Sequence, residues 1–312
     1  MDKFYMRYFN FTNGSFNTFY IMTQISEINE GVRDAVANVV SLRTPVNVLQ
    51  ETDYTIALAL EFPKLMNQKK GFPNIKFGGC FIHPSPKANV HNTFKVAYQS
   101  CKVGDLLVLV RKNGHYNAAL LRMRKSYTNP FIMKNSCDIA ELRLYRQWPE
   151  FDLGITGPYN IYPKTVTQGA LYCIIKPNPK RKTEAQFYLA EPMLQLAYDS
   201  QMTFARFIRD AINWQTGRSI SVKEKSKTDE WSKLIWDLID QTAKTYLYIS
   251  DINYFSPSCL SDNFLHLLLE KQGIDMSVPT DGNNKGKNEF SGISILFIDI
   301  DEKYEEQDDH IE

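Results

Sequence analysis

The chain has 312 residues, 43% of them hydrophobic and 13% aromatic, so it can bury a sizeable core and is not disordered over most of its length. Its 36 lysines and arginines balance 35 aspartates and glutamates, and a net charge of +1 excludes general attraction to phosphate backbones. Five scattered cysteines give no sign of a disulfide framework or a zinc site. Because we also find no membrane segment, we expect a cytoplasmic protein.

Helices are predicted near the start of the chain. Residues 1–22 are expected to be an N-terminal extension, either a strand or a loose segment, because polar residues interrupt their apolar run. Thr23 can cap a helix over residues 24–41, where apolar residues recur at helical spacing. A second helix is predicted over Glu51–Met66, and Pro63 is expected to stop or bend it.

Strands follow. Asn74–His83 is predicted to be a strand, and two apolar runs, Val103–Arg111 and Asn117–Arg124, are predicted to pair as a hairpin. The Asn113-Gly114 pair between them tolerates the positive φ angles of a tight turn. Further strands are predicted over Glu141–Tyr145 and Gly169–Ile175.

The rest of the chain is predicted to be mainly helical. One helix is expected from Glu191 to Gly217 and another over residues 228–248, both with apolar residues at a period of 3.6. The remaining predictions are a helix from Ser261 to Gly273, a loop over Asp281–Gly292, a strand over Ile293–Ile300 and an acidic tail. The expected division is an extension (1–22), an α/β domain (23–185), a mainly helical region that closes with a strand (186–300) and the tail (301–312).

One group of charged residues flanks the predicted hairpin. Asp105 precedes its first strand, and Arg122-Met123-Arg124-Lys125 ends its second. Alternate residues of a strand point to the same face, so we expect Asp105, Arg122 and Arg124 to converge on one edge of the sheet. Metal-dependent nucleases of the PD-(D/E)xK type place an Asp, then an acidic residue or Gln, then a Lys at such positions. There these residues bind Mg²⁺ and orient the attacking water.

Several further short sequence segments resemble those of a known family. The most distinctive is Trp148-Pro149-Glu150-Phe151. The segments are Phe81–Pro86, Cys101–Leu107, Ala118–Leu121, Leu142–Phe151 and Trp231–Leu238. They resemble an uncharacterised bacterial family that often neighbours phage-defence genes and looks like a variant of the PD-(D/E)xK nuclease fold. The resemblance covers roughly residues 75–240. It implies a mixed sheet of restriction-endonuclease-like type, flanked by helices, in a nuclease-like or nucleic-acid-binding component of an immune system.

The chain departs from that family's pattern in its active-site motif. Relatives tend to carry Gln-x-Lys where this chain has Arg122-Met123-Arg124. A guanidinium at position 122 cannot provide an oxygen ligand and would repel a divalent ion. Arg124 can replace the lysine as a phosphate anchor but is a poor proton donor. Asp105 is then the only certain carboxylate, with Glu51 or Glu61 of the preceding helix as a helper, and Asp105 with Glu51 would hold Mg²⁺ weakly.

Basic residues outside the motif are weaker candidates. Lys180, Arg181 and Lys182 form one basic cluster, which is more commonly a solvated loop than a phosphate track. Together with Arg122, Arg124 and Lys125, these three are the candidate nucleic-acid-binding residues. His83 and His91 lack a third ligand at the spacing of a known metal site and are expected to be surface histidines.

The sequence favours a nuclease-fold component of a bacterial antiviral defence system that binds nucleic acid or a partner subunit, with weak or absent catalysis. One alternative is an active Mg²⁺-dependent endonuclease that cuts DNA or RNA with Asp105, Arg124 and Glu51. Another is a structural subunit of a larger defence complex, with Trp231 and Trp236 as core or interface residues. No membrane partner is expected.

Overall fold

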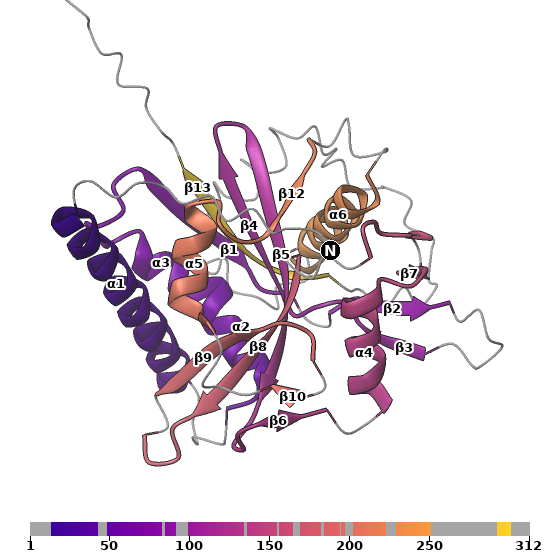
Figure 1. Ribbon diagram of the computed structural model, residues 1–312, viewed down its shortest axis with the longest axis horizontal. Helices are drawn as coiled ribbons and strands as arrows, with labels where there is room; N and C mark the ends of the chain where they lie inside the picture. The colour runs from indigo at the N-terminus through magenta and orange to yellow at the C-terminus, as the bar shows by residue number, and fades with distance from the viewer. Residues whose placement is uncertain are drawn as a thin grey trace, which may run out of the picture.

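Helices cover both faces of one central β-sheet (Figure 1). In this computed structural model the described residues are 14–42, 49–82, 85–91, 99–133, 136–154, 156–164, 169–181, 184–193, 195–196, 202–222, 229–250 and 292–300. The predicted α/β class with a mixed central sheet is confirmed.

The central sheet takes strands from both of the regions into which the sequence was divided. Its strands are β1 (Ile75–Cys80), β4 (Leu106–Lys112), β5 (His115–Lys125), β8 (Ala170–Pro177), β9 (Ala185–Ala190), β11 (Met202–Thr203), β12 (Arg218–Ile220) and β13 (Ser294–Ile300). Seven follow the order β1-β13-β4-β5-β8-β9-β11, and β12 pairs with β5. β13 is parallel to β4 and β8 is parallel to β5, whereas the other neighbours are antiparallel.

The β4–β5 hairpin forms the middle of the sheet and confirms the turn prediction. Asn113 and Gly114 have φ angles of 50° and 77°, as a tight hairpin turn requires. Leu107 and Leu120 belong to the core on one face, whereas Leu106 and Leu121 belong to the core on the other. The strands are nearly continuous apolar runs because both of their faces are buried.

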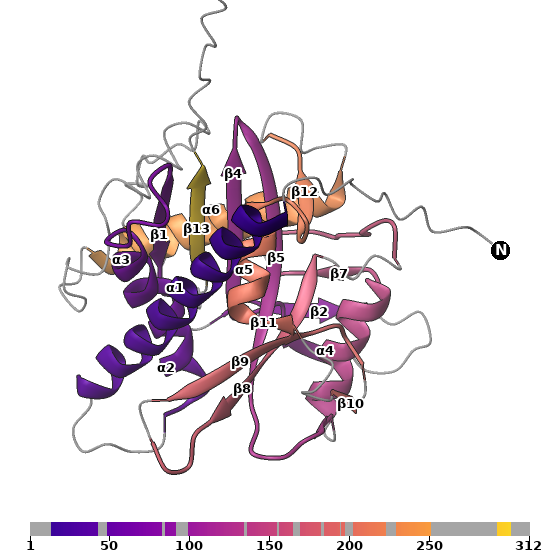
Figure 2. The ribbon, with the colours of Figure 1, turned by 60° about the vertical axis from the view of Figure 1, so that its left-hand side comes forward.

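One face of the sheet is covered by the N-terminal helices and a later one (Figure 2). They are α1 (Gly14–Ser41), α2 (Glu51–Ile56), the π-helical turn Ala57–Glu61, α3 (Phe62–Met66) and α5 (Phe204–Ile212). Ala59 in the π-helical turn lies so close to the sheet that a side chain at Gly79 would meet its carbonyl oxygen at 2.1 Å. Glycine at position 79 therefore lets the helix approach β1.

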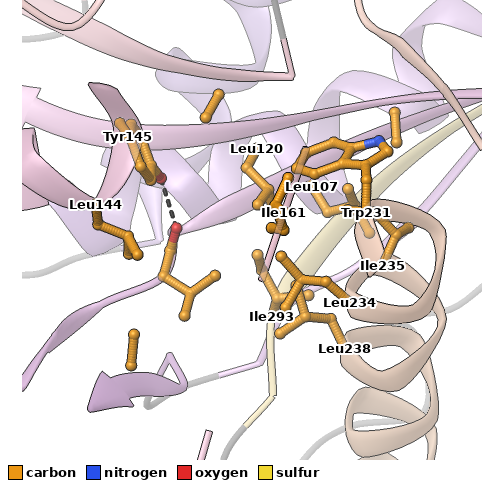
Figure 3. Packing of buried hydrophobic residues seen from close by; sticks show 14 of the residues in the cluster. Leu107, Leu120, Leu144, Tyr145, Ile161, Trp231, Leu234, Ile235, Leu238 and Ile293 are labelled. Atoms are coloured by element: carbon orange, nitrogen blue, oxygen red, sulfur yellow. Dashed lines mark hydrogen bonds between the residues drawn. The ribbon is translucent and has the colours of Figure 1, made fainter. Parts of the chain in front are cut away.

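The opposite face is covered by α4 (Ser136–Gln147) and α6 (Glu230–Ser250). Figure 3 shows Trp231, Leu234 and Leu238 of α6 packed toward the sheet, and these side chains are fully buried. Tyr145 of α4 donates a hydrogen bond of 2.5 Å from its hydroxyl to the main-chain oxygen of Val103. α4 is thereby fixed beside the start of β4.

Two small sheets flank this face. One joins β2 (Lys87–Val90), β3 (Gln99–Lys102) and β7 (Phe151–Asp152), and the other joins β6 (Phe131–Ile132) and β10 (Gln195–Leu196).

None of the helices in the described ranges is long and apolar enough to cross a membrane.

Three sequence predictions were wrong in detail. Glu141–Tyr145 is not a strand but part of α4, because Glu141, Tyr145 and Trp148 are buried at helical spacing. The helix expected from Glu191 to Gly217 is shortened to α5, since Thr203 caps it by accepting a hydrogen bond from the Arg206 N–H at 3.3 Å. α1 begins at Gly14, ahead of Thr23, because no proline interrupts its hydrogen-bonded turns.

The other predicted helices and strands that the structure describes lie close to their expected limits. A helix does cover Glu51–Met66, and Pro63 does not end it but lies in the first turn of α3, directly after the π-helical turn. α6 and β13 lie within a few residues of their predicted limits. The helix predicted from Ser261 to Gly273 and the acidic tail over 301–312 lie outside the described residues.

Candidate functional site

The hairpin brings Asp105 and Arg122 into direct contact, as the alternation of strand residues predicts. Asp105 directly precedes β4, and its carboxylate accepts hydrogen bonds from Nη1 of Arg122 and, at 2.9 Å, from the main-chain N–H of Met123. Its other oxygen lies 3.4 Å from the Ser85 hydroxyl and 3.4 Å from Nζ of Lys102. Both carboxylate oxygens of Asp105 are therefore engaged.

Two carboxylates of α4 complete the group. Nε of Arg122 donates to Glu141 at 3.0 Å, and Nη2 of Arg124 donates to Asp138 at 2.9 Å and also to Glu141. Arg122 thus bridges Asp105 of the sheet to Glu141 of the helix, and Arg124 bridges Glu141 to Asp138. We call these five residues the arginine–carboxylate network.

The network is buried. The side chain of Arg122 is 5% exposed and that of Glu141 is 4% exposed. Burial would raise the pKa of Asp105, but the charges of Arg122 and Lys102 outweigh it and hold that pKa below its ordinary value. Burial lowers the pKa of Arg122, but Asp105 and Glu141 outweigh it and raise that pKa. Arg122 therefore remains a cation at every working pH.

Glu141 is the least well compensated member. Burial raises its pKa, and the opposing effects of Arg122 and Arg124 do not cancel this increase. Two guanidinium groups hold three carboxylates in the network, so the negative charge of Glu141 is shared between both arginines. Loss of either arginine would leave a buried carboxylate with less compensation than it already has.

Glu51, the other proposed metal ligand, does not join this network. It begins α2, which packs on the other face of the sheet from α4. Its carboxylate accepts a hydrogen bond of 3.0 Å from the main-chain N–H of Lys125, and Nζ of Lys125 donates to the Leu49 oxygen at 2.7 Å. Glu51 and Lys125 thus fix the end of β5 to the start of α2.

The residues present do not fit a Mg²⁺ ion. Mg²⁺ requires free oxygen ligands in octahedral geometry, but guanidinium groups already bind Asp105, Glu141 and Asp138. Across the described ranges, no group of three or more His, Cys, Asp or Glu side chains is arranged to hold a metal ion. The position at which the sequence predicted a metal ligand, Asp105, instead belongs to a salt-bridge network.

The second basic cluster lies in the turn between β8 and β9. Arg181 is 71% exposed and pairs with Glu184 at 2.9 Å, and Lys180 uses its main-chain N–H to bind the Asn178 side chain at 3.0 Å. Lys182 lies outside the described residues. In sequence, this turn lies well apart from the arginine–carboxylate network.

His91 lies between two carboxylates of the small sheet around β7. One ring nitrogen is 2.7 Å from Asp152, and the other is 3.3 Å from Glu150. The hydrogen bond to Asp152 is the main reason why the pKa of His91 is raised, with burial acting against it and Glu150 adding to it. His83 lies outside the described residues.

Glu141 was missed from the sequence because Glu141–Tyr145 was interpreted as a strand, and Asp138, which precedes that segment, was not predicted as a site residue. The signal that would have found them is a helical repeat, since Asp138, Glu141, Tyr145 and Trp148 are spaced by three or four residues. Trp231 and Trp236, proposed as core or interface residues, are 0% and 2% exposed, so both belong to the core.

Comparison with family models, curated proteins and solved structures finds no significant match to this chain.

Proposed function

We propose that this chain is a non-catalytic, nuclease-fold component of a bacterial antiviral defence system that acts by binding nucleic acid or a partner subunit. The arginine–carboxylate network carries the non-catalytic part of the proposal. Its three carboxylates are bound by guanidinium groups, so none is free to hold Mg²⁺ or to activate water. The defence role rests on the resemblance of five sequence segments to a family that often neighbours phage-defence genes.

The positions within the network support a nuclease-like ancestry of the restriction-endonuclease type. Asp105 stands directly before one central strand, and Arg122 and Arg124 stand two residues apart on the next. This is where such nucleases place their acidic residue and lysine. In such nucleases a metal ion balances the negative charge of the carboxylates. Here Arg122 and Arg124 balance it instead.

The chemistry of the network favours a binding function over cleavage of nucleic acid. An arginine cannot act as a general base, because its pKa keeps it protonated. The network also withdraws Arg122 from the surface, so this arginine cannot hold a phosphate backbone. A binding surface must therefore lie elsewhere on the chain or use residues at the edge of this one.

Metal-dependent cleavage is the direct test. Purified chain is incubated with supercoiled plasmid and with Mg²⁺ or Mn²⁺, and Mn²⁺ binding is measured by calorimetry. We expect no nicking above the protein-free control and no bound Mn²⁺. The Asp105→Asn variant and a matched surface variant, Asp34→Asn, should behave in the same way, since neither carboxylate would bind metal. Metal-dependent nicking that only Asp105→Asn abolishes would overturn the proposal.

A further inference from the structure

Arg218 is a half-buried arginine whose surroundings differ from those of the more deeply buried arginines in the described residues. Four arginines whose side chains are 5–16% exposed each form an ion pair with a carboxylate. These are Arg111, Arg122, Arg124 and Arg209. Arg218 forms no ion pair within the described part of the chain, and its Nη1 is buried there without a hydrogen-bond acceptor. The side chain is only half-buried and its Nη2 lies on the exposed side, so Arg218 can meet a ligand that brings a counter-charge.

The surroundings hold Arg218 rigidly. It begins β12, where it pairs with Ala118 of β5. Its guanidinium carbon lies 5.2 Å from the centre of the Trp231 ring, and its Nη2 donates to the main-chain oxygen of Tyr162. Gly169 lies against the same group, since a side chain there would meet both Trp231 and Arg218. The position of the guanidinium therefore does not depend on a ligand.

The neighbouring groups leave the charge of Arg218 uncompensated. Burial lowers the pKa of Arg218, and Asp229 opposes this effect. However, Asp229 is occupied at the start of α6, where it accepts hydrogen bonds of 3.2 Å from the N–H groups of Trp231 and Ser232. The indole N–H groups of Trp231 and Trp148, whose rings are 5.6 Å apart, are also buried without an acceptor in the described ranges.

A second cation and an exposed aromatic ring adjoin Arg218. Nζ of Lys164 lies 5.4 Å from the centre of the Tyr162 ring and donates to the Trp148 oxygen at 3.2 Å. Tyr162 is 65% exposed, so its ring is accessible to a planar ligand. Lys164 lies over the exposed ring and Arg218 binds the main chain of the same residue, and this arrangement matches a ligand that has both a negative group and a planar group.

We propose that Arg218, Lys164 and Tyr162 form a binding site for a nucleoside phosphate, in which the two cations hold the phosphate and the Tyr162 ring stacks on the base. The phosphate belongs to a free nucleotide or to single-stranded nucleic acid. This site deepens the proposed function, on which the choice of nucleic acid as one source rests. It lies apart from the arginine–carboxylate network, with which it shares no residue.

Three probes test the site on the full chain: a fluorescein-labelled oligo(dT), AMP and inorganic phosphate. Arg218→Gln should weaken oligonucleotide binding about tenfold, because a charge-assisted hydrogen bond is lost. It should also reduce the slope of log K against log salt by about 0.7 for one lost phosphate contact. Tyr162→Ala should weaken binding of the oligonucleotide and of AMP about tenfold and leave inorganic phosphate unchanged.

The controls separate this site from general effects. Arg206→Gln removes an arginine that is 63% exposed and paired with Asp210, and it should leave all three affinities unchanged. Circular dichroism and urea unfolding check that Arg218→Gln is folded, and Arg218→Lys should bind with intermediate affinity. Equal affinity of Arg218→Gln and wild type for every probe, or no binding of any probe by wild type, would overturn the site.

The outcomes also distinguish this site from the proposed function. If the oligonucleotide binds and Arg218→Gln binds it equally well, the site is wrong and nucleic-acid binding stands. If AMP binds in a manner that depends on Arg218 while the oligonucleotide does not bind, the site stands with a free nucleotide as its ligand. Nucleic acid would then be excluded from the proposed function.

Discussion

Arg122 and Arg218 both belong to strands of the central sheet, but the surroundings of their guanidinium groups differ. Arg122 lies between Asp105 and Glu141, with every nearby carboxylate committed to an arginine. Arg218 lies on an indole ring, with a buried nitrogen that has no acceptor among the described residues. The first charge is neutralised by the fold itself, whereas the second remains available to a ligand.

This difference separates stability from binding. A buried guanidinium that holds two carboxylates cannot be removed without leaving them unpaired, so it acts on the folded state. A guanidinium without a counter-charge adds little to stability and costs desolvation, and such a cost is retained where it supports binding. Substitutions in the two regions should therefore change different measurements.

The largest effect is expected from Arg122→Ala. This substitution leaves Asp105 and Glu141 buried without their shared cation, which should lower the free energy of unfolding by about 3–5 kcal/mol. Urea unfolding measures the change. The matched control is Arg181→Ala, which removes a 71% exposed arginine and should leave the free energy of unfolding nearly unchanged. A loss below about 1 kcal/mol for Arg122→Ala would mean that the network does not stabilise the fold.

Introducing the Gln-x-Lys of the nuclease-like family that the sequence resembles should convert the network into a metal site. In the double variant Arg122→Gln and Arg124→Lys, Asp105 and Glu141 lose the guanidinium that bridges them, and a divalent ion can replace it. Saturation with Mn²⁺ at about 100 times its Kd should raise the free energy of unfolding by about 2.7 kcal/mol. Thermal unfolding with Mn²⁺ or with a chelator measures the change.

Two controls accompany the double variant. Wild type should show no stabilisation by Mn²⁺, because its carboxylates are already bound. Adding Asp105→Asn to the double variant should remove the stabilisation. If Mn²⁺ stabilises the triple variant as much as the double variant, the ion binds elsewhere and the network does not occupy a metal position.

Much of the sheet could be predicted because its signals are local. The Asn113-Gly114 pair fixes the hairpin, and the alternation of strand residues places Arg122 and Arg124 on one face with Asp105. β13 was also predicted as a strand from its apolar run. Its place between β1 and β4 could not be predicted, because that pairing joins residues more than 180 positions apart.

The two candidate sites differ in how far the sequence reveals them. Asp105, Arg122 and Arg124 stand on neighbouring strands and were found together, but their partners on α4 were not, because part of that helix was interpreted as a strand. Arg218, Lys164 and Trp231 were not identified as a group. They come from three separate segments, and only the pairing of β12 with β5 and the packing of α6 bring them together.

Gly169→Ala should have a smaller effect than the network substitutions. The added methyl carbon would lie 2.8 Å from two carbons of the Trp231 ring, which is fully buried and has no room to move. Such overpacking should lower the free energy of unfolding by about 1–3 kcal/mol and weaken oligonucleotide binding by displacing Trp231 beneath Arg218.

Gly104→Ala is the matched control beside the network. Its added carbon would have its nearest contact at 3.4 Å, which is ordinary van der Waals distance, so the cost should be below about 1 kcal/mol. Urea unfolding and Trp fluorescence measure both variants. Equal losses for the two glycine variants would show that the packing beneath Arg218 is no tighter than the packing beside Asp105.

His91 provides the smallest effect and a third arrangement of charge, an ion pair at the surface. Its hydrogen bond to Asp152 raises the pKa of His91, so its protonated form is favoured in the folded state. Its contribution to stability is therefore complete below the ordinary histidine pKa of about 6.5 and is lost as pH rises through the raised pKa. His91→Gln should destabilise the chain by less than about 1 kcal/mol because the pair is partly exposed.

The pH dependence makes this last effect measurable. Urea unfolding of wild type and His91→Gln should differ more near about pH 5.5 than near about pH 9, where the wild-type histidine is neutral in both states. In an Asp152→Asn background the difference at the lower pH should shrink, because the main hydrogen-bond acceptor is weakened. The same difference at both pH values would contradict a protonated His91. It would place the stabilisation in packing, whereas Arg122 keeps its charge at every working pH.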